Sequence, residues 1–319
     1  MKNYIKTTLL LFIIVNTVII NLFAQSKNNY SSSLIQSEEN NSFIIIGDTQ
    51  RACFVEIGKE KNDEVRPMIL KKIADENPSF IIHLGDFVCF GSSKNDWEKF
   101  DDLAIDIRSK NIPILPVLGN HDYFLNDKTA LRNFFSRFPD LDKQTWYSRT
   151  FNGTGFIFLN SNFDNLTKEG NQKQLSWYKK TLNDLQSDTS VKIIIICCHH
   201  APFTNSTVVS DNKDVQDLFV KPMLNIPKAK LFFTGHCHSY EHFIMENKHF
   251  IVTGGGSGPR QKLSDKPIHI DTYKGGKIRN FHFCKATLRN FGILVQMICI
   301  DDNLKKWEIG QEFFIEFEK

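Results

Sequence analysis

The sequence predicts an α/β fold in which two stacked β-sheets are flanked by helices, within one domain from Ser42 to Lys319. Two observations carry this prediction. Between residues 43 and 253, short apolar runs alternate with segments of helical periodicity, which is typical of a sheet with parallel strands. After Asn280, three strand-like runs follow one another without helices between them. The combination favours two mixed sheets.

The first elements form a β-α-β-α-β series. Apolar runs at 43–46, 80–82 and 112–118 fit short strands that are buried on both faces. Helices are expected between them at 63–76, which stops at Asn77-Pro78, and at 96–109. In both helical segments the large apolar residues recur at roughly helical spacing.

The remaining elements continue the pattern to the end of the chain. Helices are expected at 129–138, 172–186 and 215–224. A hairpin around Asn152-Gly153 joins strands at 146–151 and 155–159, and single strands are expected at 191–198, 231–234 and 250–253. Three final strands are expected at 281–288, 293–300 and 307–317, with a turn at 301–303 between the last two.

Composition is that of an ordinary globular protein. The chain has 319 residues, of which 41% are apolar and 24% charged. The formal net charge is +3, and two of these charges, Lys2 and Lys6, lie in the N-terminal segment, which leaves +1 for the rest. No basic field points to a nucleic-acid partner, and no acidic field is present.

Residues 1–24 are expected to form a signal peptide. Lys2 and Lys6 give a positive start, an apolar stretch follows from Thr8 to Ile20, and Ala24 precedes a plausible cleavage site. An uncleaved membrane anchor is the alternative, although the stretch is short for a span of about 20 residues. Residues 25–41, rich in Ser, Asn and Gln, are expected to be a flexible linker. The prediction is an exported protein, periplasmic or secreted.

The seven cysteines do not form a recognisable disulfide framework. Their number is odd and their spacings are irregular. Cys197 and Cys198 follow an isoleucine run, where cysteine often serves as a small buried apolar residue. Export would permit a disulfide, but the sequence does not demand one.

Polar side chains follow five of the expected strands, at the point where each strand ends. The five segments are Gly47-Asp48-Thr49-Gln50, Gly85-Asp86, Gly119-Asn120-His121-Asp122, His199-His200 and Gly235-His236-Cys237-His238. Each alone would be an ordinary polar turn, but five in order are not independent accidents. Ligands bind beyond the carboxyl ends of parallel strands. Carboxylate, amide and imidazole donors suit Mn, Fe or Zn, and there are enough of them for two ions.

This ordered set resembles the calcineurin-like metallophosphoesterase superfamily. The family pattern is D-x-H, GD, GNH(D/E), H and GHxH, and this chain has GD-x-Q, GD, GNHD, H and GHCH between residues 43 and about 258. The segments His200-Ala-Pro202 and His238-Ser-Tyr240-Glu241 are most similar to the purple-acid-phosphatase-like branch. The resemblance implies an αββα four-layer sandwich.

The resemblance also implies a role for each matching residue. Asp86 would bridge two metal ions. Asp48 and His238 would complete one site, and Asn120, His200 and His236 the other. His121 would act on the leaving group, with Asp122 holding or tuning its imidazole. The His-x-Pro spacing favours His200 as the ligand, so His199 is expected to point away, into packing or behind the ligands.

Two departures from the family pattern matter. Gln50 stands where the first motif has His, and it could offer a carbonyl oxygen or hydrogen-bond a substrate or water. Cys89 stands where purple acid phosphatases have a metal-binding Tyr, three residues after the bridging Asp. The chain is therefore not expected to be a true purple acid phosphatase or to hold ferric iron.

The predicted function is that of an exported hydrolase of phosphate esters that uses two divalent ions (Mn, Fe or Zn) and a hydroxide shared between them. A phosphomonoesterase is favoured; a phosphodiesterase or a nucleotide or pyrophosphate hydrolase is the alternative. A binding protein that kept the fold and lost catalysis is a third reading, supported by Gln50. The substrate is expected to depend on four loops: 51–66, 123–127, 204–214 and 257–277.

Overall fold

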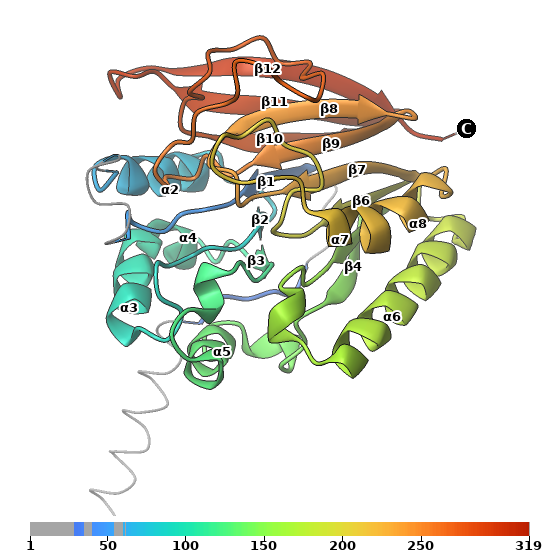
Figure 1. Ribbon diagram of the computed structural model, residues 1–319, viewed down its shortest axis with the longest axis horizontal. Coiled ribbons are helices and arrows are strands. Elements are labelled where there is room, and N and C mark those ends of the chain that lie inside the picture. Colours follow the sequence, from blue (N-terminus) through green and yellow to red (C-terminus); the bar gives the residue numbers. More distant parts are fainter. Residues whose placement is uncertain (1–28, 35–39, 54–59, 61, 319) are drawn as a thin grey trace, which may run out of the picture.

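Two six-stranded β-sheets stack face to face between helices (Figure 1). The structure is a computed structural model that describes residues 29–34, 40–53, 60 and 62–318. The strand order is β12-β11-β10-β1-β2-β3 in the first sheet and β4-β5-β6-β7-β9-β8 in the second. The predicted arrangement of two mixed sheets flanked by helices is confirmed.

The first sheet joins a parallel half to an antiparallel half. Strands β1 (Ser42–Ile46), β2 (Ile81–His83) and β3 (Ile114–Pro116) run parallel. Strands β10 (His282–Arg289), β11 (Gly292–Ile300) and β12 (Trp307–Glu316) form a meander that pairs with β1 through β10. The carboxyl ends of β1, β2 and β3 therefore lie at the same edge of the sheet.

The second sheet has four parallel strands between two antiparallel edge strands. The parallel strands are β5 (Thr154–Phe158), β6 (Ile193–Cys197), β7 (Ala229–Thr234) and β9 (Lys248–Thr253). The edges are β4 (Tyr147–Phe151) and β8 (Tyr240–Met245). Strand β8 was not predicted, because its turn to β9 uses Glu246 and Asn247 at positive φ (50° and 58°) and lacks a glycine.

Helices cover both outer faces. Figure 1 shows α2 (Val65–Asp75), α3 (Lys94–Leu103) and α4 (Ile105–Ser109) on one side of the sheets, and α6 (Lys168–Ser187) and α8 (Lys221–Leu224) on the other. The helix predicted at 96–109 is two helices, because the backbone breaks at Ala104 (ψ 18°). Helix α5 covers Asp127–Phe135. The segment 215–224 combines α7 (Lys213–Val215), a π-helical turn at Gln216–Val220 and α8.

Strand β6 shows why the sheets stack. Its side chains alternate between two buried apolar clusters: Ile193 and Ile195 join the cluster between the sheets, whereas Ile194 and Ile196 join the one under α6. Between the sheets, the rings of Phe43 in β1 and Phe156 in β5 meet edge to face, 5.3 Å apart. Each fully buried side chain of this size contributes about 1.5–3 kcal/mol relative to an exposed one, so burial of these side chains stabilises the stacking of the two sheets.

The prediction of a flexible linker at 25–41 is wrong for residues 29–34, the first of this segment that the structure describes. Tyr30 is 3% exposed, its hydroxyl donates to Asp101 Oδ1 (3.2 Å), and its ring stacks on Phe138. The Ser31 carbonyl accepts from Ile114 N–H (2.8 Å), which extends the edge of the first sheet. The prediction relied on the polar composition of the segment and did not take account of Tyr30, whose hydrogen-bond partner Asp101 is buried.

The predicted signal peptide at 1–24 lies outside the described residues. Within the residues that the structure describes, no helix combines the length and the apolar character needed to cross a membrane.

Candidate metal centre

The polar residues that follow the strands of both sheets meet at one edge. His238 Nε2, after β7, lies 3.5 Å from Asp48 Oδ1, after β1. His199 Nε2, after β6, lies 3.4 Å from Asp86 Oδ2, after β2. Asn120, after β3, joins them, with Oδ1 3.0 Å from His199 Nε2, so residues from five strand ends form one cluster between the two sheets.

The first part of this cluster is a buried group of three donors. The ligand atoms of Asp48, Asp86 and His238 all lie within 4.8 Å of one another. The amide of Gln50 lies among them, with Nε2 3.1 Å from His238 Nε2 and 3.5 Å from Asp86 Oδ2. Gln50 Oε1 is buried and has no hydrogen-bond partner. A buried acceptor without a partner costs about 1–3 kcal/mol, and a divalent cation would satisfy it. The donor set therefore fits a metal ion.

A second group lies beside the first. The ligand atoms of His199, His200 and His236 lie within 4.8 Å of one another. Asn120 Oδ1 is 3.0 Å from His199 Nε2, and His236 Nδ1 is 3.2 Å from the same nitrogen. Asn120, His200 and His236 are partly exposed, whereas the first group is buried. This second group therefore forms the side that a substrate can reach.

The expectation that His199 points away is wrong. Its Nδ1 lies 2.8 Å from the Leu84 carbonyl, which directs Nε2 toward Asp86 and Asn120. The His199 carbonyl accepts from Gly235 N–H (3.0 Å), and this contact fixes the backbone that turns the ring inward. His200 Nδ1 is held 2.9 Å from Ser161 Oγ. Both imidazoles are therefore candidate ligands, where the sequence pattern favoured His200 alone.

Backbone strain coincides with the candidate ligands. Asp48, Asp86 and His236 have φ of 63°, 57° and 66°, in the left-handed region. This conformation costs roughly 1–2 kcal/mol for a residue with a side chain, and such strain clusters at functional sites. Each of the three follows a glycine, and the sharp turn aims its side chain back across the strand ends.

The charges of the cluster are coupled. Burial raises the pKa of Asp48. Burial also acts to raise the pKa of Asp86, but the surrounding imidazoles, His199 first, bring it below its usual range. Burial acts to lower the pKa of His199, yet Asp86 raises it to about 9. Burial lowers the pKa of His200 to about 3 and that of His236 well below its usual range, so both rings are neutral at pH 7 and have a lone pair for a metal.

The expected contact between Asp122 and the His121 imidazole is also wrong. The Asp122 carboxylate accepts from the backbone N–H groups of Gly119 (2.9 Å), Asp86 (2.9 Å) and Phe87 (3.0 Å). His121 and Asp122 begin a 3₁₀ turn, His121–Tyr123, in which consecutive side chains point about 120° apart. The Asp122 carboxylate therefore ties the ends of β2 and β3 together, and burial raises its pKa to about 8.

The His121 imidazole is held instead by a disulfide segment. Its Nδ1 lies 2.9 Å from the Cys89 carbonyl oxygen, and Cys53 Sγ lies 3.6 Å from the same nitrogen. Cys53 and Cys89 form a disulfide. These two sulfurs and His121 Nδ1 have the spacing of a metal site, but disulfide sulfurs are not the thiolates that bind metals. Five other cysteines are free and buried: Cys197, Cys198, Cys237, Cys284 and Cys299.

Glu241 belongs to the segment that resembles the purple-acid-phosphatase-like branch, but the sequence assigned it no role. Its fully buried carboxylate accepts from Thr204 Oγ1 (2.6 Å), Asn205 N (2.7 Å) and Ser239 Oγ (3.3 Å). It thus ties the loop at 204–214 to the GHCH segment. Burial raises its pKa to about 7.

Replacing Glu241 with Gln is expected to change how stability depends on pH. Folding raises the pKa of Glu241 from 4.5 to about 7, so its contribution to stability is complete below pH 4.5 and is lost as pH rises through 7. Relative to Glu241→Gln, the wild type should lose about 3 kcal/mol of unfolding free energy between pH 4.5 and 8. Urea denaturation of both proteins with a chelator present measures this, and equal pH slopes would contradict it.

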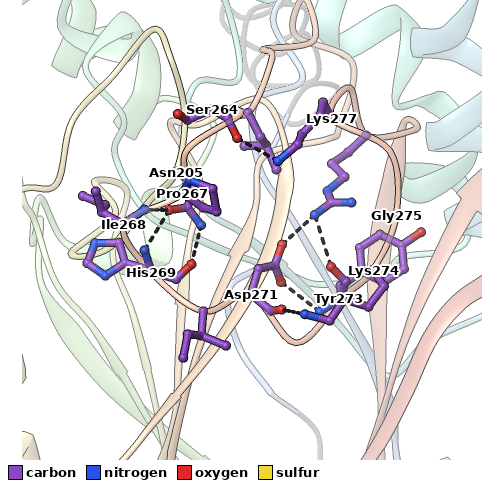
Figure 2. A pocket seen from close by; sticks show the side chains of 13 residues that line it. Asn205, Ser264, Pro267, Ile268, His269, Asp271, Tyr273, Lys274, Gly275 and Lys277 are labelled. Atoms are coloured by element: carbon purple, nitrogen blue, oxygen red, sulfur yellow. Dashed lines mark hydrogen bonds and ion pairs between the residues drawn. The ribbon is translucent and has the colours of Figure 1, made fainter.

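Two of the loops expected to select the substrate line one cavity of about 420 Å³. Figure 2 shows Asn205 and Ile268 on one side of it and Lys274 and Lys277 on the other. Both lysines donate to backbone carbonyls, those of Asp271 and Ser264 respectively. The loop at 257–277 also contacts the backbone of a candidate ligand, because Gln261 N–H donates to the His238 carbonyl (3.0 Å).

Comparison with known proteins identifies relatives of this chain. The sequence model of the calcineurin-like phosphoesterase family matches residues 42–240. Purple acid phosphatase 4 of Arabidopsis thaliana is 24% identical over 245 residues, which cover 68% of this chain and 68% of that protein. UDP-2,3-diacylglucosamine hydrolase of Shewanella piezotolerans is 26% identical over 155 residues, which cover 47% of this chain and 64% of that protein.

Two solved structures share the fold. GAP50 of Plasmodium, described as the anchor in the inner membrane complex, superposes with a TM-score of 0.69 at 18% identity and covers 87% of this chain and 89% of its own. A dimetal phosphatase from Danio rerio superposes with a TM-score of 0.58 at 12% identity and covers 87% and 99%. The family match over residues 42–240 shows that the chain belongs to the calcineurin-like phosphoesterase family of metal-dependent phosphoesterases, within which it is similar to purple acid phosphatases.

Proposed function

We propose that the protein hydrolyses phosphate monoesters with two divalent metal ions, Mn, Fe or Zn. The observation that carries this proposal is the position of Asp86 between the two donor groups. Its Oδ2 is 3.4 Å from His199 Nε2 on one side and 3.5 Å from Gln50 Nε2 on the other, and its Oδ1 accepts from His121 N–H (2.9 Å). A carboxylate in this place can be shared by two ions.

The proposed ligands divide between the two groups. Asp48, His238 and the carbonyl of Gln50 would hold the first ion. Asn120 and His236, with His199 and His200, would hold the second, and Asp86 would belong to both. When bound, the ions would neutralise phosphate oxygens and lower the pKa of a water molecule.

The chain's own residues would orient the reaction. The Cys89 carbonyl accepts from His121 Nδ1–H and leaves Nε2 for the substrate. His121 would donate from Nε2 to the leaving oxygen when its ring is protonated. Asp122 would act as a positioning residue, because its carboxylate accepts from the backbone N–H groups of Gly119, Asp86 and Phe87.

Export is part of the proposal. Besides the signal-like residues 1–24, the disulfide between Cys53 and Cys89 supports it, because disulfides persist in oxidising compartments outside the cytosol. Fractionating the expressing cells and sequencing the N-terminus of the mature protein tests this; a cytosolic protein that begins at Met1 would contradict it.

A substrate panel on protein loaded with Mn, Fe or Zn tests the reaction. Hydrolysis of monoesters, with slower hydrolysis of diesters, is the expected result. Preference for diesters or for nucleotide diphosphates would favour the alternative, which gains support from the relative named as a UDP-2,3-diacylglucosamine hydrolase. The two lysines of the cavity, Lys274 and Lys277, would suit such an anionic leaving group.

A second candidate is a binding protein with weakened catalysis. Gln50 in place of His supports it, as does the fold shared with GAP50, which is described as an anchor. Protein that holds two metal ions per chain but hydrolyses no mono- or diester would establish this second candidate.

The Gln50 carbonyl is expected to contribute to metal affinity. Replacing Gln50 with Leu removes the only unpartnered oxygen among the described residues around Asp48 and should weaken binding of one ion by about tenfold, equivalent to 1.4 kcal/mol. Replacing it with His should strengthen binding, because imidazole is the better donor to Zn²⁺.

Competition with a fluorescent chelator measures these affinities directly. Replacement of Gln174, another buried glutamine, with Leu is the matched control and should leave the affinity unchanged. An unchanged affinity in Gln50→Leu would show that the carbonyl does not bind the ion.

A further inference from the structure

We propose that the Cys53–Cys89 disulfide is a positioning element for His121, so that hydrolysis of esters with poor leaving groups depends on the oxidised form. This inference rests on the proposed function, because it assigns the disulfide to the residue that would act on the leaving group. Neither cysteine belongs to a family motif, and Cys89 stands where the purple acid phosphatases have a metal-binding Tyr.

The disulfide segment surrounds His121. The Cys89 carbonyl oxygen lies 2.9 Å from His121 Nδ1, and Cys53 Sγ lies 3.6 Å from the same atom. Two residues further on, Gly91 N–H donates to the His121 carbonyl (2.9 Å). The segment 89–91 therefore holds both the ring and the backbone of His121.

The disulfide also joins the strand ends that carry the candidate ligands. Cys53 lies five residues after Asp48, and Cys89 lies three residues after Asp86. The same two segments are also joined beside the candidate ligands, where Gln50 N–H donates to the Asp86 carbonyl (3.1 Å). Both cysteines are buried, at 2% and 0% exposure. The disulfide and the hydrogen bond between Gln50 and Asp86 therefore close a short ring that contains residues 50–53 and 86–89 and lies beside the His121 imidazole.

Reduction would disturb this arrangement at the imidazole. Two thiol sulfurs repel at distances where a disulfide joins them covalently, so at least one sulfur must move when the bond breaks. The displaced sulfur would act on His121, because Cys53 Sγ already lies 3.6 Å from its Nδ1. A new thiol can also hydrogen-bond Nδ1 and compete with the Cys89 carbonyl. Both effects would misplace Nε2.

The chemistry of reduction is simple. A trialkylphosphine attacks one sulfur, the S–S bond breaks, and water converts the adduct to the phosphine oxide and two thiols. A dithiol gives the same two thiols by exchange and becomes a disulfide itself. The five other cysteines are already free, so Cys53–Cys89 is the reducible bond among the described residues.

Leaving-group dependence separates positioning of His121 from general stabilisation. An alkoxide leaves poorly and needs the proton that His121 would supply, whereas 2,4-dinitrophenolate leaves without one. Reduction should therefore lower kcat for an alkyl phosphate by tenfold or more and kcat for 2,4-dinitrophenyl phosphate by less than about threefold. KM and metal content should change little, because no proposed ligand is removed.

The experiment compares oxidised and phosphine-reduced protein loaded with the same measured metal content. Both esters are assayed, and thiol titration confirms reduction. The double variant Cys53→Ala/Cys89→Ala lacks the cross-link and both thiols, so it should also lose kcat selectively for the alkyl phosphate and should not respond to phosphine. The matched control, Cys299→Ala, removes a free buried cysteine and should respond to phosphine as the wild type does.

Amide hydrogen exchange supplies a readout that needs no activity. Exchange at Gly91 and His121, whose N–H groups donate within this arrangement, should become faster on reduction. If the oxidised protein holds metal and hydrolyses neither ester, the proposed function fails, and the exchange result still decides the positioning role. Unchanged exchange, or equal loss of kcat for both esters after confirmed reduction, would overturn the inference.

Discussion

Replacing Asp86 with Asn is expected to remove at least one of the two metal ions and to lower kcat/KM by roughly 10³-fold or more. Loss of a bridging carboxylate removes several kcal/mol of charge stabilisation, and each 1.4 kcal/mol is a factor of ten in rate. The carboxylate lies between the two donor groups, 3.4 Å from His199 Nε2 and 3.5 Å from Gln50 Nε2. An Asn side chain keeps the shape and one acceptor, but it cannot bridge two cations with a full negative charge.

The fold should survive this change. His121 N–H donates to Asp86 Oδ1, and Asn Oδ1 can accept the same bond. Metal analysis by mass spectrometry and kinetics on a chromogenic monoester are the measurements. The control is Asp101→Asn, which breaks a buried pair with Arg137 (2.7 Å) away from the candidate ligands. That variant should lose stability and keep both metal ions. Two ions and near-normal turnover in Asp86→Asn would refute the bridging role.

The sequence predicted that the candidate ligands would lie together, because strand ends are visible as patterns. A buried strand appears as an apolar run, and its end appears where polar residues begin, so Asp48, Asp86, Asn120 and the histidines could be assigned to one edge. Order along the chain was sufficient for this step, since parallel strands place their carboxyl ends together. The confirmed sheets follow from the same patterns.

Side-chain direction after a strand end could not be predicted in the same way. His199 turns inward because its carbonyl binds Gly235 N–H and its Nδ1 lies against the Leu84 carbonyl, two contacts with residues remote in sequence. Asp122 faces backbone N–H groups because a 3₁₀ turn separates it from the His121 ring. The direction of each of these two side chains depends on tertiary contacts, which the spacing of residues in a motif does not reveal.

The disulfide illustrates the same limit. Cys53 and Cys89 are 36 residues apart and belong to different strand ends, so their pairing follows from the parallel register of β1 and β2 and not from any local spacing. Tyr30 was overlooked for a related reason: its buried partners, Asp101 and Phe138, lie on other elements. What remained unpredictable was which distant residues meet.

Replacing His121 with Ala is expected to keep both metal ions and to lower kcat for an alkyl phosphate by about 10² to 10⁴-fold, the usual effect of losing general acid catalysis. The imidazole is the only part that changes near the substrate. The backbone N–H of residue 121 still donates to Asp86 Oδ1, so the carboxylate proposed to bridge the ions should stay in place. The loss should be much smaller for 2,4-dinitrophenyl phosphate, whose leaving group needs no proton.

This variant tests catalysis apart from metal binding and stability. Metal content and both esters should be measured on one preparation, and added imidazole should restore part of the activity, because His121 is partly exposed and its removal opens a space beside Phe124. Asp122→Asn is the matched comparison: it weakens a buried acceptor of three backbone N–H groups and should lower the free energy of unfolding by about 1–3 kcal/mol, with no imidazole rescue. Equal loss of metal and activity in His121→Ala would instead make His121 part of the metal site, and the disulfide beside it would then position a ligand.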